Sequence, residues 1–301
     1  MTASSTAHCT TTVPDAPGPS GAPAGPGRPQ PCAASHRRIG ELFPALRVHG
    51  GPPRSGDGWI AGADLIARPE ALRELIAHDA GEGLARYGRP LRPDVAAGFG
   101  LHRFTWPAAL LFTLPWFLER RVPLLAPADV SVRRRTGELT ARTGAFVCLP
   151  DDPATGLPGA RPVAGEPELA AELRSALARF LTPVLGAFRP EVRRGPRTLW
   201  AMATDAVVEG LWHVGGLLGE ADRARTELTA LLAPVPPGCA PGADVSSFTP
   251  GAGFATARPG LSCAPGAPDT PTTDRTRASC CLVYTVQAEA MCGGCPRVMR
   301  G

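Results

Sequence analysis

The chain has 301 residues, of which 31 are basic and 27 acidic, so its formal net charge is +4, and every basic residue is an arginine. This near balance, without a long basic run, argues against a nucleic-acid-binding protein. The longest apolar stretch, Pro107 to Leu118, is shorter than the roughly 20 residues that a transmembrane helix needs. We therefore expect a protein with no transmembrane segment and no nucleic-acid partner.

Composition and cysteine usage indicate the compartment and the kind of chemistry. Residues 1–35 are rich in Ala, Pro, Gly and Ser, and they lack the basic start and apolar stretch of a secretory signal. We therefore expect a cytoplasmic protein. Four of the nine cysteines lie between Cys280 and Cys295. In the cytoplasm, clustered cysteines more often bind a metal or carry redox chemistry than form disulfides.

Composition also divides the chain into four parts. A disordered N-terminal tail is predicted at 1–35, because this stretch has low hydrophobicity and no periodicity. A helical body follows at 36–232, and a Pro/Gly-rich linker at 233–273. The cysteine-rich segment occupies 274–301.

The first half of the body reads as three helices. The first begins at Pro69 and ends at 81–83, where Gly-Glu-Gly interrupts the apolar periodicity. Asp94 caps a second helix. A third begins at 105–107, is apolar nearly all round, and is bent by Pro115.

The middle of the body changes to a period of two. Val130 and Val132 alternate with polar residues, Gly137 provides a turn, and 145–148 is apolar again, so we expect a small antiparallel ribbon.

Helical periodicity returns at Glu168, in a stripe that Pro183 kinks or divides. The next helix is capped by Thr198 and ends around 215–216, and a shorter one covers 221–232. The predicted fold class is α+β, with a mainly helical body, a small antiparallel sheet and the C-terminal segment.

The pattern that carries chemistry is Cys-Cys-x10-Cys-x2-Cys, formed by Cys280, Cys281, Cys292 and Cys295. Four thiolates in one short segment suit a thiophilic metal or an iron–sulfur cluster. The adjacent pair fits tetrahedral zinc poorly, because neighbouring side chains diverge and zinc sites use regular Cys-x2-Cys pairs. A two-iron cluster offers two metal centres and accepts the pair more readily.

With this spacing, the tail resembles the FhuF-like ferric siderophore reductases, in which Cys-Cys-x10-Cys-x2-Cys holds a [2Fe–2S] cluster. The resemblance implies that the same four cysteines ligate the cluster, and that residues 274–301 are a [2Fe–2S]-binding segment. No catalytic residue beyond these ligands is expected, since electron transfer needs no acid–base pair. Two upstream segments, 101–107 and 197–200, are more loosely similar to the family.

The resemblance further implies the enzyme activity of a ferric siderophore reductase. One electron converts Fe(III), held by hard oxygen ligands such as hydroxamates, to Fe(II), which those ligands hold far less tightly. Fe(II) would then be released in the cytoplasm. The expected substrate is a ferric siderophore, with the hydroxamate type favoured.

The electron source is expected to lie outside the chain. The stretch 56–61 matches Gly-x-Gly-x-x-Ala, but no strand precedes it, so it does not indicate a dinucleotide site. The donor would be a ferredoxin or an NAD(P)H-dependent reductase. Arg275, Arg277, Arg297 and Arg300 flank the cysteines, and folded over a cluster they would raise its potential.

Alternatives remain open for several features. The cysteines could form a zinc-stabilised binding or adaptor module, or the chain could be a generic iron–sulfur electron carrier. Trp106 and Trp200 are expected in the core, with a place on the substrate surface as the alternative. Arg133–Arg135 is read as a solvated hairpin end, or as a contact for an acidic chelate or ferredoxin. Cys148 is expected to be a small buried side chain.

Overall fold

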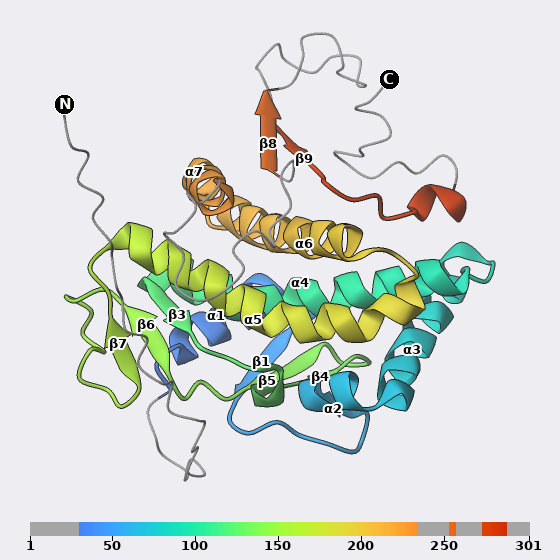
Figure 1. Cartoon of the computed structure of the whole chain (residues 1–301), viewed down its shortest axis with the longest axis horizontal. Helices are drawn as coiled ribbons and strands as arrows, with labels where there is room; N and C mark the ends of the chain where they lie inside the picture. Colours follow the sequence, from blue (N-terminus) through green and yellow to red (C-terminus); the bar gives the residue numbers. More distant parts are fainter. Residues whose placement is uncertain (1–29, 234–252, 257–272, 288–301) are drawn as a thin grey trace, which may run out of the picture.

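A computed structural model describes residues 30–233, 253–256 and 273–287 (Figure 1). The helices are α1 (Ala33–Leu42), α2 (Gly62–Ala67), α3 (Pro69–Tyr87), α4 (Pro93–Glu119), α5 (Glu166–Val192), α6 (Pro196–Leu217) and α7 (Ala221–Leu232). The strands are β1 (Arg47–Gly50), β2 (Trp59–Ala61), β3 (Arg121–Pro123), β4 (Val130–Arg133), β5 (Glu138–Ala141), β6 (Phe146–Cys148), β7 (Ala160–Pro162), β8 (Gly253–Thr256) and β9 (Thr273–Thr276). Short 3-10 turns cover Pro127–Asp129 and Val283–Thr285.

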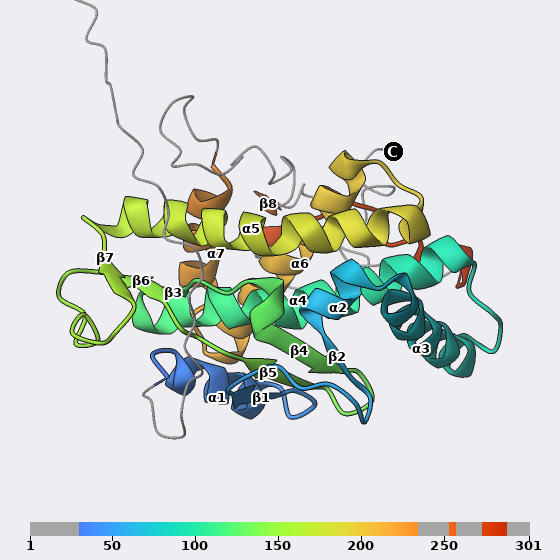
Figure 2. The same ribbon diagram turned by 60° about the horizontal axis from the view of Figure 1, so that its bottom comes forward.

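Helix α4 is the centre of the molecule. It packs against α5 and α6 on one side, and α1 and strands β1, β4 and β5 lie on the other (Figure 2). Its sequence is apolar nearly all round, and most of its side chains from Val95 to Phe117 are buried, as that composition predicts. The other elements are therefore arranged around one buried helix.

The sequence-based division of this region into two helices is wrong, because α4 runs unbroken through Pro107 and Pro115. Each interior proline removes a backbone hydrogen bond and costs about 3 kcal/mol. Fully buried side chains such as Leu110 and Phe112 each contribute about 1.5–3 kcal/mol, so tertiary burial outweighs both interruptions. Asp94 is not the cap, since Arg92 takes that position and ion-pairs with it.

The predicted end of the first helix is also wrong. Helix α3 passes through Gly81 and Gly83 and ends at Gly88, which has a left-handed φ of 67°. A glycine inside a helix costs only about 1 kcal/mol. At Gly83 the missing side chain is used, because a Cβ there would lie 2.4 Å from a methyl carbon of Leu91.

The strands form mixed sheets. The four-stranded sheet has the order β1-β5-β4-β2, in which β4 and β5 pair antiparallel, as the ribbon predicted, and β1 runs parallel to β5. Residues 146–148 do not extend this ribbon. They form β6 in a second sheet with the order β3-β6-β7, because β5 already has a neighbour on both edges.

The remaining helices follow the sequence more closely. Helix α5 continues through Pro183 without dividing, α6 is capped by Gly195 rather than Thr198, and α7 has the predicted bounds. The α+β fold class is confirmed, with sheets that are mixed rather than purely antiparallel. In the described ranges, no helix has both the length and the apolar character to cross a membrane.

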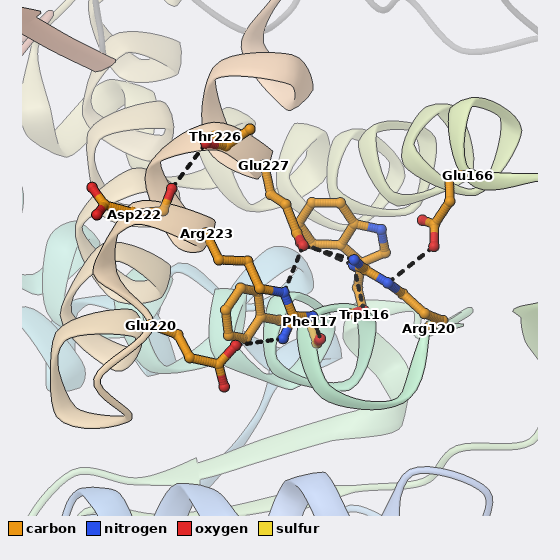
Figure 3. Close-up of polar contacts among 9 residues, drawn as sticks. All are labelled: Trp116, Phe117, Arg120, Glu166, Glu220, Asp222, Arg223, Thr226 and Glu227. Atoms are coloured by element: carbon orange, nitrogen blue, oxygen red, sulfur yellow. Dashed lines mark hydrogen bonds and ion pairs between the residues drawn. The ribbon is translucent and has the colours of Figure 1, made fainter.

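A cluster of ion pairs ties the end of α4 to α5 and α7 (Figure 3). Arg120 has a left-handed φ of 53° and makes two hydrogen bonds to Glu227, at 2.9 and 2.7 Å. Its Nε lies 3.1 Å from Glu166 on α5. Arg223 on α7 bonds Glu227 at 2.9 Å and donates to the carbonyl oxygen of Phe117. The carbonyl end of α4 is thus covered by two arginines.

Candidate metal centre

The described structure contains the first half of the cysteine pattern. Cys280 and Cys281 lie in the chain that follows β9, and both are partly exposed. Cys292 and Cys295 lie outside the described residues. Within the described ranges, no three His, Cys, Asp or Glu side chains are grouped as they would be around a metal ion. The proposed ligand set is thus represented here by its adjacent pair.

The chain reaches this pair along α6 (Figure 1). There it is held by the buried carboxylate of Asp205. Oδ1 of Asp205 accepts a hydrogen bond from the amide of Ala278 at 2.8 Å. Oδ2 accepts from the amide of Ser279 at 2.8 Å and from its hydroxyl at 2.6 Å. The Asp205 side chain is 0% exposed. These bonds fix the backbone immediately before Cys280.

The electrostatics of Asp205 reflect this placement. Burial raises the pKa of its carboxyl group above the ordinary value, while the hydrogen bonds from Ser279 and Ala278 and the nearby Arg277 lower it. Burial has the larger effect. The carboxylate is therefore a costly group to bury, and its three hydrogen bonds offset part of that cost.

Two arginines of the segment face a second carboxylate on α6. Arg275 Nη2 lies 3.0 Å from Oε2 of Glu209, and Arg277 Nη1 lies 3.7 Å from the same oxygen. Both arginine side chains are only 9–10% exposed. Their charge is largely balanced by Glu209 and Asp205, so their effect on a cluster's potential would be smaller than the sequence suggests. Arg297 and Arg300 lie outside the described residues.

The backbone turns sharply after the cysteine pair. Leu282 has a left-handed φ of 60°, an uncommon conformation for a residue with a branched side chain. A 3-10 turn follows at Val283–Thr285, and the Thr285 hydroxyl donates to the Leu282 carbonyl oxygen at 2.7 Å. Such strain persists where surrounding contacts fix the backbone, and it is concentrated at functional sites.

A pocket of about 200 Å³ opens beside Cys281. The C-terminal segment provides one wall with Cys281, Ser279 and Arg277. The other walls come from α3, α4 and α6, and include Tyr87, Phe99, His102, Arg103 and Met202. A ligand residue of the candidate centre is therefore accessible from a cavity that a small molecule can enter.

His102 in this pocket is held in its neutral form. Burial in the pocket wall lowers its pKa to about 4, opposed by Glu209 and assisted by Arg277, Arg275 and Arg103. The side chain is recessed rather than sealed, with 34% of its surface exposed. At neutral pH the imidazole adds no positive charge to the pocket.

The described residues fit one half of a two-iron site. Thiolates are the donors that iron–sulfur clusters use, and both cysteines are accessible in a segment that Asp205 fixes on the body. Sequence reasoning did not identify Asp205. The available signal was an aspartate inside the apolar run of α6, at a position that the helix buries.

The other residues singled out from the sequence have clear positions. Cys148 is fully buried, as predicted, and Cys32 is buried as well. Trp106 and Trp200 pack partly buried against the core, and Trp106 also lines a second pocket. Arg134 is not merely a solvated hairpin residue, because its Nη2 lies 2.6 Å from the fully buried Asp79.

Comparison with known proteins identifies the segment. Residues 277–297, which include all four cysteines, match the protein-family model described as the FhuF 2Fe-2S C-terminal domain. No curated protein matches the whole chain closely enough to count as a relative. The family resemblance and the [2Fe–2S] cofactor are therefore confirmed for the C-terminal segment.

Proposed function

We propose that this chain, which carries an FhuF-type [2Fe–2S] segment, is a ferric siderophore reductase. In the reaction, the protein loses one electron, Fe(III) in a siderophore gains it, and the chelator then releases Fe(II) into the cytoplasm. A compartment that keeps thiols reduced suits four cysteine ligands. The observation that carries the proposal is the match over 277–297, together with a pocket walled by Cys281.

The proposed ligands are Cys280, Cys281, Cys292 and Cys295, and the cluster they hold would supply a one-electron carrier. Other residues of the chain position the cysteine pair and leave Cys281 accessible. Asp205 fixes the backbone that precedes the pair, and Arg275 and Arg277 bind it to α6. The pocket beside Cys281 then lets a chelate approach one of the ligands.

The electrons are proposed to come from an external ferredoxin or NAD(P)H-dependent reductase. In the structure, residues 56–61 form a tight turn that leads into β2, with positive φ at Gly56, Asp57 and Gly58. A dinucleotide fingerprint instead needs a strand before the glycines and a helix opening within them. Fast reduction of the purified protein by NADPH alone would contradict this part of the proposal.

The test is stopped-flow spectroscopy on anaerobically purified holoprotein. After reduction with dithionite and removal of the excess, the EPR signal and visible absorption of a [2Fe–2S] centre should be present. Mixing with a ferric trishydroxamate should oxidise the protein faster than buffer does, with Fe(II) appearing in equal amount. If no ferric chelate oxidises it faster than buffer, the reductase proposal fails.

Matched cysteine variants sharpen this test. Cys281→Ser is expected to lose the visible absorption and at least tenfold of the reduction rate, because an oxygen replaces a thiolate ligand. Cys148→Ala removes a fully buried thiol away from the segment and should retain both. Colourless wild-type protein that purifies with zinc would instead favour the binding-module alternative.

A further inference from the structure

Helix α4 is buried except along one face. Between Val95 and Phe117, partial exposure is confined to four residues, namely Phe99, His102, Arg103 and Trp106. Their spacing of i, i+3, i+4 and i+7 places them on a single helix face. Because a helix rises about 1.5 Å per residue, this open stripe extends for roughly 10 Å.

Two pockets lie along this stripe. The first, of about 200 Å³, is the one beside Cys281. The second, of about 370 Å³, is lined by Trp106 and by residues of β4 and β5 such as Val132 and Leu139. His102 and Arg103 line both pockets. The stripe is thus the floor of one groove, here called the α4 groove, which connects Cys281 to the four-stranded sheet.

The size and walls of the α4 groove suit an organic ligand. Taken together, the two pockets fall within the roughly 300–1,000 Å³ that small-molecule sites occupy. Tyr87, Phe99 and Trp106 provide aromatic surface along its length. His102 and Arg103 lie between Phe99 and Trp106 along the stripe, so polar groups alternate with aromatic surface, as in a site that orients its ligand.

The charges of the groove favour hydrogen-bond acceptors. Arg103, Arg134 and Arg277 line it, whereas Glu82 is the one carboxylate among the lining residues of the two pockets. Arg103 and Arg134 both ion-pair with the fully buried Asp79 and with Glu82. Arg277 lies 3.8 Å from Asp205 and 3.7 Å from Glu209. The positive charges of these arginines are therefore largely balanced, while their guanidinium groups still offer N–H donors to oxygen acceptors. A groove with little net charge favours an uncharged chelate over one with an ammonium group, because burying an unpaired charge is costly.

We propose that the α4 groove is the binding site for the ferric chelate, with the iron-bearing end against Cys281 and the organic chain along Trp106. This inference rests on the proposed function and adds where its substrate binds and which charge is preferred: an uncharged chelate, bound in the α4 groove. Chelates that carry a free amine bind more weakly. Seating the chelate against a cluster ligand shortens the path of the electron.

The test uses gallium(III), which has the charge of Fe(III) but does not accept an electron under these conditions. The Ga(III) complex of a linear trishydroxamate with a free amine, and the same complex after N-acetylation, are titrated calorimetrically into holoprotein. The N-acetylated complex should bind at least threefold more tightly. Arg134→Gln should reduce this preference. Equal affinity for the two complexes would overturn the charge argument.

Two tryptophan variants test the location. Trp106→Leu should weaken binding of the N-acetylated complex about tenfold and raise the KM for the ferric form with little change in kcat. Trp59→Leu is the matched control, because Trp59 is on β2 and lines neither pocket, and it should bind as the wild type does. Unchanged affinity in Trp106→Leu would overturn the proposal that the chelate binds in the α4 groove.

The two proposals can fail separately. If ferric chelates oxidise the protein but Trp106→Leu leaves affinity and KM unchanged, the reductase function stands and the groove is wrong. If the gallium complex binds and Trp106→Leu weakens it, while no ferric chelate is reduced, the groove stands and the reductase proposal fails. Circular dichroism of each variant confirms that it is folded.

Discussion

At the scale of single residues, Asp205 determines where the cysteine segment sits. Its carboxylate accepts hydrogen bonds from the amides of Ala278 and Ser279 and from the Ser279 hydroxyl, so it fixes the course of the backbone. The Asp205 side chain is fully buried. Hydrogen bonds to a charged acceptor contribute about 1.5–3 kcal/mol each. Cys280 follows directly, so its position depends on these bonds.

Asp205→Asn is therefore expected to loosen the segment. An amide has one acceptor oxygen, so its NH2 group would face an N–H donor, and docking should weaken by about 1–3 kcal/mol. We expect faster loss of iron and sulfide to an external chelator at neutral pH, measured from the visible absorption. Asp222→Asn is the control, since its side chain is 94% exposed. Equal rates in both variants would show that Asp205 does not position the pair.

The residues of the site were predictable to different degrees. Cysteine spacing identifies the ligand candidates because thiolates at fixed intervals have few other uses. Asp205 gives no such signal, because its partners are backbone amides far along the chain. The pocket residues Tyr87 and Phe99 lie on different helices, α3 and α4, so their meeting depends on tertiary packing that no local pattern records.

At the scale of elements, the end of α4 is held by charge. Glu227 on α7 accepts hydrogen bonds from Arg120 and Arg223, and both guanidinium groups also lie over aromatic rings of α4 (Figure 3). Burial tends to raise the pKa of Glu227, but the bonds from the two arginines outweigh burial and hold the pKa below its ordinary value. The charged form is therefore the one that joins these helices.

This pKa shift predicts how stability depends on pH. A carboxyl group with a lowered pKa in the folded protein contributes stability above its unfolded pKa of about 4.3, and the contribution is lost as pH falls through the folded value. The free energy of unfolding should therefore decrease on acidification below about pH 5. Glu227→Gln should cost about 1–3 kcal/mol at pH 7 and show a shallower acid decrease, measured by urea titration. An acid decrease as steep as that of the wild type would exclude Glu227 as a contributor.

The elements also show where sequence patterns fail. Helices α5 and α7 were predicted because their apolar stripes keep helical spacing over many residues. Helix α4 was predicted as two helices because a proline is expected to break a helix locally. The burial that stabilises α4 depends on the whole fold. The parallel pairing of β1 with β5 was not predicted, since four-residue strands far apart in the chain carry no signal of their partner.

At the scale of the whole molecule, the body does not depend on the cysteine segment for its core. The main buried cluster is built from the elements between α1 and α7, and among the apolar side chains described in 275–287, Ala278 is the one that packs against it. Most of the favourable burial is therefore independent of the metal centre.

Cluster removal is accordingly expected to leave the body folded. Cys281→Ser, or treatment with a chelator, should abolish the visible absorption while far-ultraviolet circular dichroism changes little. The free energy of unfolding, measured by urea titration, should change by less than about 1 kcal/mol. Small metal-dependent domains, in contrast, unfold without their ion. Cooperative loss of helical signal when iron is removed would show that the segment is part of the folding unit.

The pairing of β8 with β9 has a practical consequence. Gly253 lies opposite Thr276 and Thr256 opposite Thr273, so the two ends of 257–272 emerge from neighbouring positions of one antiparallel ladder. A connection between such ends can be as short as a two-residue turn. The stretch is thus a natural place to insert an affinity tag or a fluorescent reporter, which would lie next to the [2Fe–2S] segment without altering its route along α6.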